Sequence, residues 1–195
     1  DQVPDVWRPR FALAVVPLAI FLWKAALVLL FVCTKWLVVG RATESAHGMW
    51  DSFPARNFFM WRVIAWLHPA TTLLGGTLAL NVVLRAVGLR IGAGALISSP
   101  TSYFDVDLLE IGEGALLHQP RWQIHTFEDR VLKLYATSVG SGAVVTNAII
   151  MGGASVEAGS VVLSRSCVLK GETLAGHRVY AGAPVSCVGA CPGSV

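Results

Sequence analysis

The chain has 195 residues and a formal net charge of +3, and 54% of its residues are hydrophobic while only 14% are charged. Because soluble globular proteins carry a charge on nearer a quarter of their residues, we expect part of this chain to lie in lipid. The C-terminal half has no basic stripe interleaved with aromatic residues, which argues against nucleic acid as a partner. The sequence begins with Asp1 rather than Met, so we expect a fragment or a processed chain.

The first apolar segment predicts a transmembrane helix over about residues 11–36. Residues 11–34 contain a single charge, Lys24, and as a helix they would extend about 36 Å, enough to cross a bilayer. We expect Pro17 to kink the helix and Lys24 to extend toward the membrane surface. A buried core helix or a cleaved signal peptide would have a shorter apolar core. Residues typical of membrane surfaces flank the segment: Trp7, Arg8, Arg10, Lys35, Trp36 and Arg41.

A second apolar segment, residues 58–87, is interrupted by charged residues, proline and glycine. The segment fits a kinked second crossing, a re-entrant hairpin or an interfacial helix. We expect this segment to be embedded in the membrane, and the sequence does not decide whether it crosses from one side to the other. Residues 1–88 are therefore predicted to form a membrane-anchoring helical region. Its orientation stays open, because basic residues flank both ends of the first helix.

A six-residue repeat begins after Leu89, where I-G-A-G-A-L, I-G-E-G-A-L and V-G-S-G-A-V start at positions 91, 111 and 139. If each six-residue unit forms one short strand and one tight turn, three units make a triangular coil of about 18 residues. The repeat predicts a mainly β fold, a parallel β-helix over residues 89–185, followed by a tail at 186–195. Aliphatic residues then recur every six positions with small residues between them: Ile150, Ala154, Val156, Ser160, Val162, Ser166, Val168 and Leu174.

The largest departure from the repeat is the stretch from 118 to 133, H-Q-P-R-W-Q-I-H-T-F-E-D-R-V-L-K. We predict His125 as a general base, because an imidazole titrates near neutral pH and takes a proton from an amine or a hydroxyl. Either Glu128 or Asp129 is expected to orient the second ring nitrogen of His125. The alternative is that these three residues and Arg130 form an ordinary polar network that anchors the loop.

Three further side chains are candidates for substrate contact. Lys170 and Arg178 lie near the last coil, where point charges suit the phosphates of CoA or of a phosphopantetheine arm, although a solvated charge is the commoner explanation. His118 occupies a turn position, with a structural role as the alternative. The four cysteines form no paired Cys or Cys–His motif, so the sequence predicts no metal site and a reduced compartment.

The hexads and the closing motif Y-A-G-A-P at 180–184 resemble left-handed β-helix acyltransferases such as the serine and sugar acetyltransferases. Nearly the whole chain is similar to the C-terminal region of membrane-bound nonribosomal peptide synthetases of the epsilon-poly-lysine synthetase type. The shared motifs are K-W-L-V-V-G-R at 35–41, L-R-A-V-G-L-R-I-G at 84–92, H-T-F-E-D-R-V-L-K at 125–133 and V-L-K-G-E-T-L at 168–174. The chain departs from the pattern at Glu157, where glycine is usual.

The resemblance implies a left-handed coil and an acyltransferase module that joins carrier-activated amino acids to an amine, with His125 in the site. The implied donor is acyl-CoA or a phosphopantetheine-carrier thioester, which favours the cytosolic side of the membrane for the β-helix. Implied partners are membrane lipid, adenylation and carrier domains, and two more β-helices in a homotrimer or a tandem pseudo-trimer. Two alternatives stay open: a membrane-anchored CoA-dependent O- or N-acetyltransferase, and a non-catalytic trimeric scaffold.

Overall fold

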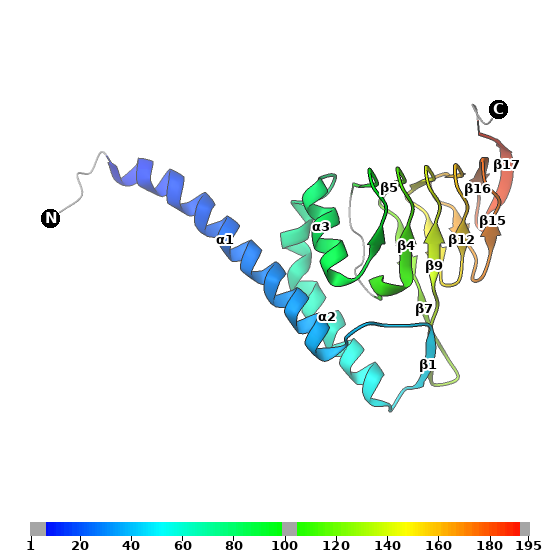
Figure 1. Cartoon of the computed structure of the whole chain (residues 1–195), viewed down its shortest axis with the longest axis horizontal. Helices are drawn as coiled ribbons and strands as arrows, with labels where there is room; N and C mark the ends of the chain where they lie inside the picture. The colour runs from blue at the N-terminus through cyan, green and yellow to red at the C-terminus, as the bar shows by residue number, and fades with distance from the viewer. Residues whose placement is uncertain (1–6, 99–104, 192–195) are drawn as a thin grey trace.

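The computed structural model describes residues 7–98 and 105–191, and within them the chain forms a helical region followed by a parallel β-helix (Figure 1). Helix α1 (Trp7–Val38) extends away from the β-helix, and α2 (Ser52–Thr72) packs beside its C-terminal part. Helix α3 (Leu78–Val87) lies at the end of the coil stack where the chain enters it. The helices and the coils share one hydrophobic core, in which Phe31 of α1 and Met60 of α2 are buried.

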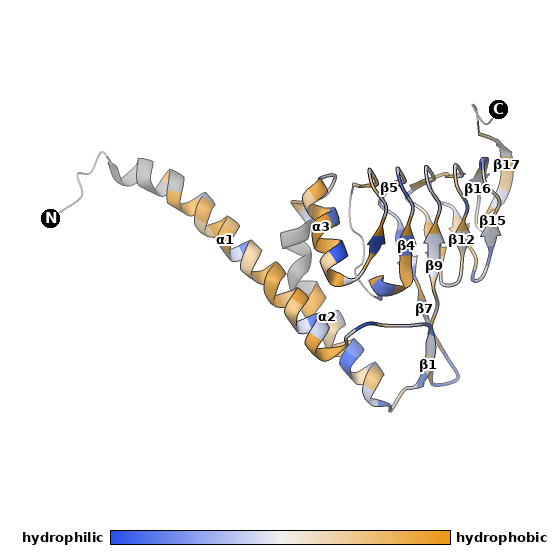
Figure 2. Cartoon of the chain, viewed as in Figure 1, coloured by the Kyte–Doolittle hydropathy of each residue, from blue (hydrophilic) through white to orange (hydrophobic). Residues whose placement is uncertain are grey.

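Helix α1 is long and apolar enough to cross a membrane, and no other helix among the described residues meets that test. The qualifying part is Val15–Val38, 24 residues with a mean hydropathy of 2.5, of which only 6% is buried against the protein. Figure 2 shows the hydrophobic residues along this helix. Phe21 and Leu22 are among its exposed side chains. So little burial is unlike the core helix of a soluble protein: apart from residues near its C-terminal end, such as Phe31, most of its apolar side chains are exposed. The helix continues through Pro17.

The second apolar segment is divided between the end of α2, a turn and the short helix α3. Helix α3 covers the first coil with one face, where Leu80 and Leu84 are buried. Asn81 on the same face donates a hydrogen bond from Nδ2 to the carbonyl oxygen of Ala95, 2.7 Å away. On the other face Leu78 and Val82 are exposed. One side of this segment is therefore part of the protein core, and the other presents apolar side chains outward.

The β-helix has three parallel sheets, one on each side of the triangular coil. The first contains β2 (Arg90–Ile91), β4 (Leu109–Ile111), β9 (Thr137–Val139), β12 (Ser155–Val156) and β15 (Thr173–Leu174). The second contains β3 (Leu96–Ile97), β5 (Leu116–His118), β10 (Val144–Thr146), β13 (Val161–Val162) and β16 (Arg178–Ala181). The third contains β6 (Arg121–Gln123), β11 (Ile149–Met151) and β14 (Cys167–Val168), and the 3-10 helix η1 (Val106–Leu108) precedes β4.

The predicted column of inward side chains is confirmed. Ile150, Val156, Val162 and Val168 have no exposed surface, and Leu174 is 2% exposed. The small residues between them are buried as well: Ala154, Ser160 and Ser166.

Glycine is required at the two positions of each G-x-G motif for different physical reasons. A Cβ at Gly112 would overlap the backbone of Ser141 in the next coil, so close stacking of the coils requires glycine there. Gly114 has open space around it but a φ of +64°, which disfavours other residues. Glu157 occupies the same kind of corner later in the stack, where its carboxylate accepts a hydrogen bond from the N–H of Gly176 at 2.9 Å.

Two segments differ from the predicted division of the chain. The expected tail begins with strand β17 (Ser186–Ala190), which pairs antiparallel with β16 and covers that edge of the coil stack. Strand β1 (Ser45–Gly48), within the predicted membrane-anchoring region, pairs with a hairpin that extends from the β-helix. The helical region and the β-helix therefore share a sheet as well as a core. Neither pairing is visible in a local repeat, because each joins strands that differ in direction from the coils.

Candidate active site

The stretch that breaks the repeat forms a β-hairpin, and it projects from the coil between β6 and β9 (Figure 1). Its strands are β7 (His125–Glu128) and β8 (Val131–Leu134), and β1 pairs with the other edge of β8. Because side chains alternate along a strand, His125 and Phe127 share one face of β7, and Thr126 and Glu128 share the opposite face. The hairpin thus separates an aromatic face, which contains the histidine, from a charged face.

On the aromatic face, the imidazole of His125 contacts a buried carboxylate. Nδ1 of His125 lies 2.7 Å from Oδ2 of Asp105, and the side chains are 17% and 1% exposed. The second oxygen, Oδ1 of Asp105, accepts a hydrogen bond from Nδ2 of Asn57 at 2.9 Å. A carboxylate only accepts, so Nδ1 donates and the neutral ring carries its free lone pair on Nε2.

The expectation that Glu128 or Asp129 orients His125 is wrong in this structure, because Asp105 has that place. Asp129 lies in the exposed turn at the far end of the hairpin, with a φ of 52°. Glu128 points to the opposite face and pairs with lysines. A signal for Asp105 does exist in the sequence. No acidic residue occurs between Asp51 and Asp105, so a carboxylate inside the apolar motif D-V-D-L-L needs a partner.

Aromatic rings enclose the imidazole on the helical side. The ring of Trp61, from α2, is stacked on His125 with centroids 4.4 Å apart and 24° between the planes. Phe127 meets His125 edge-on at 5.6 Å and stacks on Phe58 of α2 at 5.7 Å. These contacts restrict the rotation of the imidazole and keep one side of it dry.

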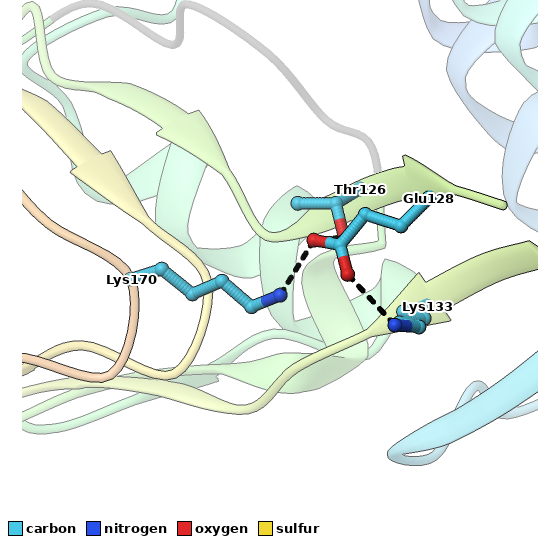
Figure 3. A network of polar contacts seen from close by, with 4 residues as sticks. All are labelled: Thr126, Glu128, Lys133 and Lys170. Atoms are coloured by element: carbon cyan, nitrogen blue, oxygen red, sulfur yellow. Dashed lines mark hydrogen bonds and ion pairs between the residues drawn. The ribbon is translucent and has the colours of Figure 1, made fainter.

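The charged face of the hairpin is organised around Glu128 (Figure 3). Its two carboxylate oxygens accept hydrogen bonds from Lys133 and Lys170, both at 2.7 Å, and a third comes from Thr126 at 3.0 Å. The hydrogen bonds from Lys133, Lys170 and Thr126, in that order, lower the pKa of Glu128 to about 2. Lys170 also lies 4.4 Å from the ring centroid of Tyr135, whose pKa its hydrogen bond lowers. Lys170 thereby joins the turn after β14 to the hairpin.

The other predicted contact residues are not brought to His125. His118 ends β5, where its Nδ1 lies 2.7 Å from Oγ of Ser98. Arg178 begins β16 and is exposed. Of the predicted substrate-contacting residues, only Lys170 reaches the hairpin. Within the described ranges, no three His, Cys, Asp or Glu side chains are gathered to hold a metal ion.

Two cavities lie near the hairpin, and neither is lined by His125. A groove of about 470 Å³ runs between residues 41–44 and the outer face of the first sheet, with Arg90 and Ser138 in its lining. A second cavity of about 30 Å³ lies between α1, α2 and η1 and is lined by Asn57, Trp61 and Asp105. It has room for about two water molecules. The candidate site is therefore defined by the contacts of His125 and not by a cavity.

Comparisons with known proteins agree with this architecture. No protein-family model matches the chain. The chain is 28% identical over 187 residues, 88% of its length, to the delta-poly-L-ornithine synthetase of Acinetobacter baumannii (strain AB307-0294), and it spans 13% of the length of that synthetase.

Among solved structures, the maltose O-acetyltransferase from Clostridium difficile 630 matches with a TM-score of 0.50 and 11% identity, over 81% of this chain and 97% of that chain. A hexapeptide-repeat acetyltransferase from Vibrio cholerae O1 biovar eltor, complexed with acetyl coenzyme A, matches with a TM-score of 0.48 and 11% identity, over 64% and 85% of the two chains. The first likeness gives the β-helix the fold of the hexapeptide-repeat acetyltransferases.

Proposed function

We propose that this chain is the acyl-transfer module of a membrane-bound synthetase, which joins carrier-activated amino acids by transferring an aminoacyl group to an amine. The observation that carries the proposal is the 2.7 Å contact between His125 and the buried Asp105. His125 lies on the hairpin that extends from the coil and Asp105 directly precedes η1, beside helices that include the long apolar α1. The likeness to a poly-ornithine synthetase over 88% of the chain supports an amino acid as the acyl group.

The chemistry follows from the free Nε2 of His125. Nε2 takes a proton from the acceptor amine while the nitrogen of that amine attacks the carbonyl carbon of the thioester. A C–N bond forms, the C–S bond breaks, and the imidazolium returns the proton to the leaving thiolate. Asp105 stabilises the imidazolium between these two transfers, and its hydrogen bond holds the ring in the required tautomer.

The donor is a thioester of a pantetheine thiol, carried by CoA or by a carrier domain. We propose that Lys170 binds the phosphate of this arm, because the Lys170 ammonium group reaches Glu128. Glu128 is on the hairpin that also contains His125. Three residues of strand, about 10 Å, separate His125 from Glu128. His118 and Arg178 are proposed as further donor contacts, on the second sheet of the coil.

The remaining proposals concern the surroundings of the module. We propose that α1 spans the membrane and that the β-helix winds left-handed. The β-helix lies on the cytosolic side in this proposal, where adenylation and carrier domains supply the thioester. Two more β-helices complete a homotrimer or a pseudo-trimer. The second sheet supports this, because its outward side chains form an apolar row in register: Leu96, Leu116, Val144, Val161 and Val179.

Replacing His125 with Ala tests the function. We expect transfer of an ornithyl group from a pantetheine thioester to a free amine to fall roughly 100- to 10,000-fold, the usual contribution of a general base. His47→Ala is the matched control, because His47 lies on β1 of the same small sheet and stacks on Phe53 instead. Near-normal turnover by a folded His125→Ala protein would refute the proposal. Saturable transfer from acetyl-CoA, with none from the aminoacyl thioester, would instead indicate a CoA-dependent acetyltransferase.

A further inference from the structure

Helix α2 supplies a buried amide to the acid of the His125–Asp105 pair. Asn57 is 5% exposed, and its Nδ2 donates to Oδ1 of Asp105 over 2.9 Å. The other oxygen of the same carboxylate contacts the imidazole. We propose that Asn57 is a positioning residue, which fixes the carboxylate of Asp105 and through it the ring of His125. The proposal rests on the function proposed above.

The reason for such a residue lies in the freedom of a carboxylate. The terminal torsion of an aspartate is broad, so a carboxylate held at one oxygen still rotates and exchanges its two oxygens. Asn57 occupies Oδ1 and leaves Oδ2 as the acceptor for Nδ1 of His125. With Nδ1 fixed as the donor, the lone pair of Nε2 stays available as the base.

The same face of α2 also contacts the imidazole directly. Trp61 follows Asn57 by four residues, one helical turn, and stacks on His125 at 4.4 Å. One helix therefore holds both members of the catalytic pair. The β-helix of residues 89–185 supplies His125 and Asp105 but lacks the two side chains that hold them, so the predicted anchoring region completes the site.

Among the described residues that line the small cavity with Asp105, the other two charged side chains form an ion pair. Lys35 of α1 and Asp107 of η1 line the small cavity with Asn57, and they pair at 2.8 Å. On the hairpin, Glu128 and Lys133 pair with each other on the face opposite to His125. Because Lys35 is already paired with Asp107, a carboxyl introduced at position 57 would face Asp105 without an unpaired lysine in the cavity lining, and one of the two carboxyls would keep its proton to a higher pH than usual.

Two substitutions of Asn57 and one control test the inference with the full chain in lipid nanodiscs. Asn57→Leu cannot donate, and we expect kcat to fall roughly 10- to 100-fold at every pH with little change in KM, since one hydrogen bond to a charged group is lost. The carboxyl of Asn57→Asp donates only while protonated. Its activity relative to the wild type is therefore expected to decrease as pH rises. Asn81→Leu removes another buried helical amide, which donates to Ala95, and should leave kcat and the pH profile unchanged.

A structural role alone would give a relative activity for Asn57→Asp that does not vary with pH, and this result would overturn the proposal even if Asn57→Leu does not fold. Equal losses of kcat in Asn57→Leu and Asn81→Leu would also overturn it. The proposed function fails separately. If His125→Ala remains active, both proposals fall; if His125→Ala is inactive and Asn57→Leu has normal kcat, only the positioning role falls.

Discussion

Removing Lys35 should lower the free energy of unfolding by weakening the contact between the helices and the β-helix. Nζ of Lys35, near the end of α1, lies 2.8 Å from Oδ1 of Asp107, and the two side chains are 8% and 2% exposed. Oδ2 of Asp107 accepts the N–H of Ala42 at 2.9 Å. Gly88 closes the space around the pair, because a Cβ there would overlap Oδ1 of Asp107. Lys35→Met therefore leaves a buried carboxylate with one backbone donor and no cation.

The magnitude follows from this burial. At 2.8 Å and an effective dielectric constant near 20, the Coulomb attraction is about 6 kcal/mol, much of which offsets the desolvation of the two charges. Loss of one partner of such a pair costs about 3–5 kcal/mol, because the other charge stays buried without compensation. In Lys35→Met combined with Asp107→Asn, the amide oxygen still accepts from Ala42 and no charge remains. We expect the double variant to lose less than the sum of the single losses.

Guanidinium unfolding in detergent, followed by far-UV circular dichroism, measures these free energies of unfolding. Lys24→Met is the matched control, because Lys24 lies on the same helix and takes no part in the ion pairs found among the described residues. We expect it to change stability by less than about 0.5 kcal/mol. A Lys35→Met protein as stable as the wild type, or losses that simply add in the double variant, would refute the reasoning.

Two further predictions concern the hairpin and the coil. The pKa of Glu128 is lowered from 4.5 to about 2, so its bonds to Lys133 and Lys170 stabilise the hairpin above about pH 4.5. This stabilisation is lost as pH falls toward 2, and hydrogen exchange of the β7 amides should increase in that window. Glu128→Gln should remove the pH dependence. Leu116→Glu places a charge in the apolar row of the second sheet and should convert the proposed trimer to monomers in analytical ultracentrifugation. Thr173→Glu, whose side chain points outward on the first sheet, should leave the trimer intact. A trimer that survives Leu116→Glu would count against packing through the second sheet.

The coil could be predicted from the sequence because its determinants are local. Inward residues six positions apart, such as Val156 and Val162, meet in every coil whatever the rest of the chain does. The same locality located the interruption at 118–133, since a repeat shows where it is broken, but the hairpin there was not predicted. His125 was selected by its chemistry within that interruption, and its role stays a prediction; the structure places it beside a buried acid.

The partners of His125 could not be predicted in this way, because they come from distant parts of the chain. Asp105 is 20 residues away, and Asn57 is 48 residues before Asp105. Spacing favoured the nearer acids Glu128 and Asp129, but strand alternation turns Glu128 away and the hairpin turn takes Asp129 to the far end. The hydrophobic pattern predicted the helices, yet their apolar residues alone did not reveal the buried Asn57 between them.

The motif D-V-D at 105–107 connects these observations physically. Its first acid holds His125 and Asn57, and its second holds Lys35 and the N–H of Ala42. A single short 3-10 segment therefore receives contacts from α1, α2 and the hairpin at once. A displacement of either helix relative to the coil has to break one of these buried contacts or move Asp105. The position of the imidazole is thus set by the helices as much as by the β-helix, and a coil separated from them would retain its fold pattern but lose the geometry of the His125–Asp105 pair.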